Sequence, residues 1–305
     1  MKETKKAYKG FNSDMTCRGF QYEVGKEYEC EGGVALCSNG FHACENPLDV
    51  LDHYDNVDGK YCEVEQYGEI VSDNRKTASS RIKINAEIGF VGLFKEGVEW
   101  LKELTNPQKI IKADKHSSGN SAKIGSSGDS AQIGSSGDYA KIGSSGNSAK
   151  IGSSGYSAKI GSSGYSAKIG SSGNSAQIGS SGNSAQIGSS GDSAKIGSSG
   201  DYAQIGSSGD YAKIGSSGDY AKIGSSGNSA QIGSTGEDSV ICCAGEDSIV
   251  KAKLGSWITL SEWRYDEKKG RRVPVYVKTE QVDGIRIKAD TWYKLENGEF
   301  TEANK

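Results

Sequence analysis

The chain has 305 residues, with 43 glycines and only 3 prolines, and its formal net charge of −3 does not indicate binding to a polyanion or a membrane surface. Hydrophobic residues make up 34% of it, no run approaches the eighteen apolar residues of a membrane-spanning helix, and the opening MKETKKAYKG lacks the apolar core of a secretory signal. The seven cysteines, an odd number, suit a reducing compartment better than a disulfide framework, so we expect a cytoplasmic protein of two or three structural units.

Residues 1–80 predict a small α+β domain. The segment RGFQYEVGKEYECEGGVALCSNGFHAC is typical of short strands joined by glycine turns. The segment ENPLDVLDHYD that follows predicts a helix with Asn46 as its N-cap and Pro47 at the first helical position.

Residues 81–118 predict a strand and a helix that connect this domain to the repeats. The segment RIKINAEIG alternates like a strand. The segment LFKEGVEWLKELT carries apolar residues at helical spacing, namely Leu93, Val98, Trp100, Leu101 and Leu104. We expect this helix to cover the open N-terminal end of the repeat tract.

Residues 119–253 form fifteen nine-residue repeats in one phase, thirteen of them nearly identical. Isoleucine recurs from Ile124 to Ile232, and alanine recurs two places earlier, from Ala122 to Ala230. A spacing of two places both side chains on one face of a strand. The repeat therefore predicts a half-buried strand at Ser-Ala-Lys-Ile and a turn at Gly-Ser-Ser-Gly.

A single repeat buries too little surface to be stable alone. Burial of an isoleucine contributes about 1.5–3 kcal/mol, whereas ordering nine backbone residues costs about 9–18 kcal/mol. Only stacking can close this gap, so we expect a mainly β chain whose central β-solenoid encloses the Ile and Ala stripe. We favour two repeats per coil, in about 7.5 coils, over the alternative of three repeats per coil.

Two other interpretations of the tract were considered. A disordered Gly/Ser linker would not hold isoleucine at a fixed period thirteen times. A calcium-binding roll also has a nine-residue repeat, but its oxygen cages need a carboxylate in nearly every coil. Here many repeats carry Asn or Tyr instead, and the aspartates lie one residue too early: Asp129, Asp138, Asp192, Asp201, Asp210 and Asp219. We expect folding without metal or cofactor.

Residues 254–305 predict a β-meander that caps the other end of the solenoid. The strands are expected in GSWITLSEW, RRVPVYVKTEQV and GIRIKADTWYKL, and Asn297-Gly298 is a strong hairpin signal. Exposed strand edges invite end-to-end polymerisation, so two caps favour a finite rod over a fibre.

The N-terminal domain contains a weak candidate for a zinc site. Cys30, Cys37, His42 and Cys44 lie within fifteen residues but lack the paired C-x₂-C spacing of a structural site. The simpler interpretation is that they are core residues, with His42 and Cys44 on the same buried face of a strand. We therefore expect no metal.

Catalytic chemistry has equally little support in the sequence. His42 with Glu45 and Arg18 would suit a transferase-like cleft, but no nucleophile and base occur at a supporting spacing. Cys242 and Cys243 alternate sides of a strand, so one is expected to be buried and neither redox-active. We expect a protein that is not an enzyme.

The outward solenoid positions form the candidate interaction surface. With two repeats per coil, Tyr202 and Tyr220 stack on one side while Tyr211 lies opposite. These outward tyrosines and lysines either only keep the stacked repeats soluble or form a flat surface that recognises a partner. Eight lysines against six aspartates in the regular repeats argue against mimicry of a polyanion, and the lack of an arginine cluster argues against DNA binding. The candidate residues are Tyr139, Tyr156, Tyr165, Tyr202, Tyr211, Tyr220, Lys213 and Lys222.

Both ends of the chain contain distinctive segments around the nine-residue glycine-containing repeats, namely CRGFQYEVGKEYE, GFHACENPLDVLDHY, LGSWITLSEW and IRIKADTWYKLENGEF. In these segments and in the repeats, nearly the whole chain resembles a group of uncharacterised bacteriophage and prophage proteins. The resemblance implies a phage origin, hence the host-cell cytoplasm, and a shared layout. It implies no catalytic residues.

These observations predict a non-enzymatic binding or scaffold protein that uses a rigid solenoid surface. A phage origin would make blocking or sequestering a host factor, such as a defence protein, a natural counter-defence role. The alternatives are a transferase-like enzyme in residues 1–80 and a structural spacer or virion component. The expected partner is a host protein or complex, oligomerisation is possible, and neither a membrane nor a nucleic acid is expected as partner.

Overall fold

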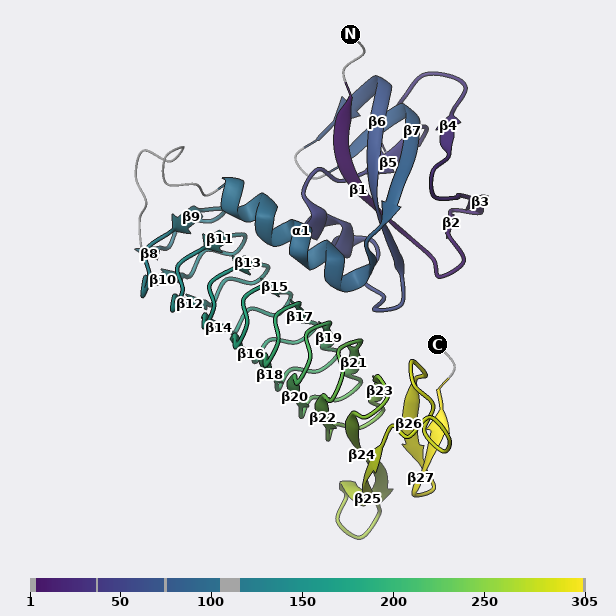
Figure 1. Cartoon of the computed structure of the whole chain (residues 1–305), viewed down its shortest axis with the longest axis vertical. Helices are drawn as coiled ribbons and strands as arrows, with labels where there is room; N and C mark the ends of the chain where they lie inside the picture. Colours follow the sequence, from purple (N-terminus) through teal and green to yellow (C-terminus); the bar gives the residue numbers. More distant parts are fainter. Residues whose placement is uncertain (1–3, 37, 74–75, 105–115, 304–305) are drawn as a thin grey trace. The chain divides into compact units, whose positions relative to one another are not determined.

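The computed structural model describes residues 4–36, 38–73, 76–104 and 116–303. The chain divides into two compact units, residues 1–100 (unit 1) and 101–305 (unit 2), and each is described by itself. The fold is mainly β, and a β-solenoid of about eight turns spans residues 123–260 (Figure 1).

Unit 1 is built on an antiparallel sheet in the order β1-β6-β7-β4, with β5 paired to β7. Its strands are β1 (Lys5–Phe11), β4 (Glu27–Glu29), β5 (Phe41–Ala43), β6 (Lys60–Ser72) and β7 (Thr77–Glu87), and β2 (Thr16–Cys17) and β3 (Phe20–Gln21) form a separate hairpin. The boundary predicted at residue 80 is wrong because it falls inside β7, whose Ile82 and Ile84 are fully buried in the unit 1 core.

Both predicted helices are present in the structure. The first is a 3-10 helix, η1 (Pro47–Asp52), and the Asn46 side chain caps it by accepting a hydrogen bond from the Leu48 N–H at 3.1 Å. The second is α1 (Gly89–Leu104), whose Gly97 lies so close to Leu48 that a Cβ there would approach it to 2.6 Å. The role of α1 as a solenoid cap stays a prediction.

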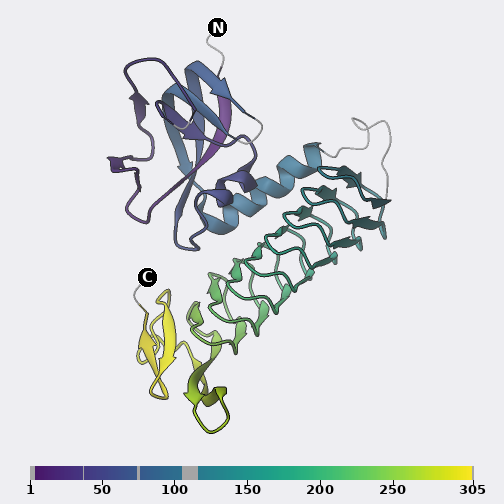
Figure 2. The same cartoon turned by 180° about the vertical axis from the view of Figure 1, so that it is seen from behind.

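Each coil of the solenoid contains two repeats, one in each of two parallel sheets, as predicted (Figures 1 and 2). The even sheet contains β8 (His116–Ser117), β10 (Gln132–Ser135), β12 (Lys150–Ser153), β14 (Lys168–Ser171), β16 (Gln186–Ser189), β18 (Gln204–Ser207), β20 (Lys222–Ser225) and β22 (Val240–Cys243). The odd sheet contains β9 (Lys123–Ser126), β11 (Lys141–Ser144), β13 (Lys159–Ser162), β15 (Gln177–Ser180), β17 (Lys195–Ser198), β19 (Lys213–Ser216), β21 (Gln231–Ser234) and β23 (Ile249–Lys251).

The interior of the solenoid is the predicted Ile and Ala stripe. Ile178 and Ala176 at mid-length are both fully buried, and the other regular coils repeat this arrangement. The stripe continues beyond the repeats through Ile258 and Leu260, which belong to the same core. Burial of these side chains between stacked coils stabilises a tract in which no single repeat could fold alone.

The strands lie two residues later in each repeat than predicted. Each strand consists of Lys/Gln-Ile-Gly-Ser. The turn is centred on the two residues after the first glycine of the repeat, which are Asn, Asp or Tyr and then Ser or Tyr. The reason is the stacking of turn glycines: a Cβ on Gly200 would overlap the carbonyl of Gly182, one coil earlier. The other glycine lies within a strand, and in the even sheet, as at Gly206, it faces outward with open space above it.

The aspartates of the repeats have a structural role in these turns. The Asp201 Oδ1 accepts a hydrogen bond from the backbone N–H of Asp219, eighteen residues later, at 3.0 Å. Asn183 accepts from the Asp201 N–H in the same way at 3.1 Å. Because an amide oxygen serves as well as a carboxylate, Asp and Asn alternate freely at this position.

The C-terminal region is not one meander but two hairpins, and each extends one sheet. β24 (Trp257–Asp266) adds a further parallel strand beside β22 and then pairs antiparallel with β25 (Arg271–Gln281). β26 (Tyr293–Glu296) pairs antiparallel with β23 and with β27 (Glu299–Glu302). The even sheet therefore runs on to Leu260, past the boundary predicted at residue 253.

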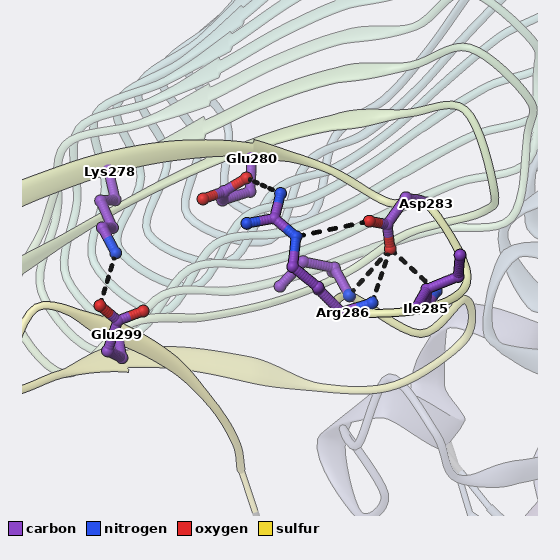
Figure 3. A network of polar contacts seen from close by, with 7 residues as sticks. Lys278, Glu280, Asp283, Ile285, Arg286 and Glu299 are labelled. Atoms are coloured by element: carbon purple, nitrogen blue, oxygen red, sulfur yellow. Dashed lines mark hydrogen bonds and ion pairs between the residues drawn. The ribbon is translucent and has the colours of Figure 1, made fainter.

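A polar network holds the segment between the two hairpins (Figure 3). The Asp283 carboxylate accepts hydrogen bonds from the N–H groups of Ile285 and Arg286, both at 2.8 Å. The Arg286 guanidinium forms an ion pair with Glu280 of β25 at 2.8 Å. Lys278 of β25 forms an ion pair with Glu299 of β27 at 2.9 Å, which links the two hairpins.

Candidate interaction surface

A groove of about 1040 Å³ runs along the outward face of the even sheet, from Gln132 to Cys242. In each strand the isoleucine and the last serine face the core, so the first residue and the glycine face outward. The groove floor is a row of five glycines that we call the glycine row: Gly152, Gly170, Gly188, Gly206 and Gly224.

The glycine row is regular and open. Consecutive members pair in register, Gly152 with Gly170 and Gly170 with Gly188, so they repeat at the strand spacing of about 4.8 Å. A Cβ added at any of the five would meet nothing within 4 Å. The groove exists because the repeat places glycine where other sheets carry a side chain.

The residues beside the glycine row give the groove a positive charge. Lys150, Lys168 and Lys222 are exposed and line it, and glutamines occupy the equivalent positions of β10, β16 and β18. Among the described residues, no carboxylate lines the groove. The aspartates of the repeats lie at the turns instead, so the solenoid separates a cationic sheet face from acidic edges.

The tyrosine candidates lie on the edges of the solenoid. The rings of Tyr202 and Tyr220 stack with their centroids 5.1 Å apart and their planes 12° apart, and Tyr211 lies on a turn of the opposite edge, as predicted. All six tyrosines are 46–60% exposed. Tyr165 shares the edge of Tyr202 and Tyr220, whereas Tyr139 and Tyr156 lie on the edge of Tyr211.

The candidate lysines belong to different sheets. Lys222 begins β20 and lines the groove, whereas Lys213 begins β19 of the odd sheet. The predicted set therefore does not form one continuous surface. Sequence reasoning missed the glycine row, because a strand placed at Ser-Ala-Lys-Ile leaves that glycine in a turn.

Two adjacent cysteines mark the C-terminal end of the groove. Cys242 takes the place of a glycine in the outward row, pairs in register with Gly224 and is exposed. Cys243 faces the core, and burial raises the pKa of its thiol to about 12, so it stays protonated and unreactive. The predicted alternation of the two side chains is confirmed.

The candidate zinc ligands do not form a cluster in the described residues. Cys37 lies outside them. Cys30 is half-buried, His42 lies between the buried Phe41 and Ala43, and Cys44 is buried opposite Tyr8. Within residues 4–36, 38–73, 76–104 and 116–303, no three His, Cys, Asp or Glu side chains are grouped as metal ligands.

Comparison with known proteins identifies a domain in unit 1. Residues 5–96 match a family model described as a domain of unknown function (DUF7666), so the chain carries this domain in unit 1. No curated protein and no solved structure matches the chain. The solenoid lies outside the matched range. In the described part of the chain, no helix has both the length and the apolar character needed to cross a membrane.

Proposed function

We propose that this chain is a non-enzymatic binding protein whose even sheet presents its groove to an acidic surface of a partner protein. A β-solenoid repeat fold fits a binding or scaffold role. The observation that carries the proposal is the row of bare glycines bordered by Lys150, Lys168 and Lys222. An opposing surface can approach the backbone of this sheet closely while its carboxylates meet the lysines.

The rigidity of the groove supports this role. Each groove-lining strand, from β10 to β22, is hydrogen-bonded to a strand on both sides, and the Ile stripe packs beneath it. Binding to such a surface costs little ordering of the groove itself, because its backbone is already fixed. The stacked Tyr202 and Tyr220 on the adjoining edge offer an aromatic anchor of the kind enriched at interfaces.

We further propose that the partner is a host protein, such as a defence factor, and that the chain acts in the host cytoplasm. This step is supported by the resemblance of the chain to phage proteins and not by any residue of the groove. A virion component is the second class of role to test, by looking for the protein in purified virions.

The groove can be tested by filling it. The double variant Gly188→Trp, Gly206→Trp places two large side chains in open space above the sheet, so the fold should be retained. The matched control adds the same residues outside the groove, as Val277→Trp and Ile285→Trp, at positions 64% and 84% exposed. Each protein is used to capture partners from host lysate, and the captured protein is then purified and its affinity measured.

The proposal expects a partner that binds the wild-type and control proteins equally and the filled groove at least tenfold more weakly. Replacing Lys150, Lys168 and Lys222 with glutamine, which the repeats themselves use, should weaken binding and reduce its dependence on salt. A partner that binds the filled groove as tightly as the wild type would contradict the proposal.

A further inference from the structure

Unit 1 contains a pocket of its own, of about 720 Å³. Its lining comes mainly from β1, the β2–β3 hairpin, β5 and the segment after η1. The charged and polar side chains that line it include Lys9, Arg18, His42, Tyr54 and Lys76.

The Lys9 amine is buried in this pocket, where burial lowers its pKa and the neighbouring Cys17 thiol raises it. Lys9 is 6% exposed, and its Nζ donates a hydrogen bond to the His42 carbonyl at 2.9 Å. The Nζ also lies over the rings of Phe11 and Tyr22, 5.5 and 5.6 Å from their centroids. Among the described residues, no carboxylate forms an ion pair with it. An anionic ligand would favour the protonated form of Lys9 and supply the counter-charge that no carboxylate provides.

Arg18 adds a second cation in a strained backbone conformation. Arg18 and Gly19 form the turn of the β2–β3 hairpin, with φ values of 51° and 77°. Such a turn normally carries Asn, Asp or Gly at its first position, and a long side chain there costs stability. Strain of this kind persists where the side chain serves a function, and the turn places Arg18 on the pocket lining.

The pKa of His42 is affected by three cations that line the same pocket. Burial lowers the pKa of the half-buried His42, and the charges of Lys9, Arg18 and Lys76 lower it further. Two carboxylates also line the pocket, Asp52 and Glu29, and Glu29 is paired with Arg81 at 2.6 Å. The lysines and the arginine therefore outnumber the acids.

An aromatic surface adjoins these cations. Phe20 directly follows the Arg18-Gly19 turn, lines the pocket and is 46% exposed. Its ring is held edge-on by Tyr22 at 4.8 Å and Tyr28 at 5.4 Å. A fixed ring that remains partly exposed beside buried cations suits a ligand with one planar part and one anionic part.

We propose that the unit 1 pocket binds a nucleotide, with its phosphates near Lys9, Arg18 and Lys76 and its base against Phe20. The proposal concerns a binding site in unit 1 and does not depend on the solenoid groove. A nucleotide is the ligand class that would contact all three features, namely the buried lysine, the strained arginine and the exposed ring.

Isothermal titration of the full chain tests the ligand class. The probes are ADP, GDP, CDP and UDP, with pyrophosphate and the four free nucleosides as separate arms. The proposal expects at least one diphosphate to bind at least tenfold more tightly than pyrophosphate and than its own nucleoside. Failure of all four diphosphates to bind would overturn the proposal. Equal binding of pyrophosphate would overturn the role of the ring, and equal binding of a nucleoside would overturn the role of the cations.

Variants then test two contributors, the exposed Arg18 and the half-buried Lys76. Arg18→Asn should weaken binding of the best diphosphate about ten- to a hundredfold while leaving the melting temperature equal or higher, because Asn tolerates this turn conformation. Lys76→Gln should weaken binding by a similar factor. Lys60→Gln is the control, because Lys60 pairs with Glu87 at 2.7 Å and does not line the pocket. Unchanged affinity in both Arg18→Asn and Lys76→Gln would overturn the proposal.

Discussion

Unit 1 and the solenoid are stabilised in opposite ways. In unit 1 each buried contact occurs once, as in the Asn46 cap or the packing of Gly97 on Leu48. In the solenoid the same Ile, Ala and turn-glycine contacts recur in every coil, so each coil is constrained by its neighbours. A repeated interior leaves no room for a unique site, and new function can arise only on its outward face. The varied interior of unit 1 can hold a pocket.

The largest expected effect comes from removing the two C-terminal hairpins, residues 254–305. β22 and β23 would lose their partners β24 and β26, and their unpaired N–H and C=O groups could template another chain's end. We expect concentration-dependent oligomers or fibres by light scattering.

The control for this truncation ends the chain after Ala303 and keeps β27 intact, since that strand runs to Glu302. It should stay discrete in size. A protein lacking residues 254–305 that remains monodisperse at high concentration would show that the hairpins do not protect the solenoid end.

Within the repeats, Ile178→Asp should be the most damaging substitution. Ile178 is fully buried at mid-length, and an aspartate there would place an unpaired carboxylate between coils. We expect the free energy of unfolding to fall by about 4 kcal/mol or more, as measured by denaturant unfolding monitored by circular dichroism. Lys168→Gln, on the exposed face, should change stability by less than about 0.5 kcal/mol. Equal effects would mean that the two faces are assigned wrongly.

Two glycines of one repeat lie in different environments, one in the stacked turns and one on the open groove, and alanine substitutions distinguish them. Gly200→Ala would force its Cβ into the backbone of Gly182 and should cost about 1–3 kcal/mol. Gly206→Ala faces open space and should stabilise the strand by about 0.5–1 kcal/mol, because alanine loses less backbone entropy on folding. Thermal unfolding of the pair decides the point, and a destabilising Gly206→Ala would place that residue in a packed environment.

The smallest expected effects come from replacing one asparagine in each unit with alanine and comparing the two losses of stability. Asn46 is buried, caps η1 and donates to Asp49 at 2.8 Å, so Asn46→Ala should destabilise unit 1 by about 1–2 kcal/mol. Asn183 makes one exposed hydrogen bond to the Asp201 N–H, and Asn183→Ala should cost less than about 1 kcal/mol. Hydrogen exchange should localise each loss to its own unit. Equal losses would contradict the contrast between unique and repeated contacts.

The sequence by itself determined that the repeat tract is a β-solenoid and which side chains face its interior. Isoleucine at every ninth residue, with alanine two places earlier, allows only one inward face, and a two-repeat coil then places Tyr202 on Tyr220. The N-cap at Asn46 could also be predicted from the sequence, because Asn followed by Pro is a local signal for the start of a helix.

Only the tertiary structure decided the strand limits, the C-terminal hairpins and the lining of the pocket. Strands at Ser-Ala-Lys-Ile and at Lys-Ile-Gly-Ser bury the same isoleucine, and the choice between them depends on Gly200 meeting Gly182 one coil away. The pairing of β23 with β26 joins Val250 to Tyr293 across a long separation in sequence. Likewise, the burial of Lys9 and the backbone strain at Arg18 arise from segments that meet only in the fold.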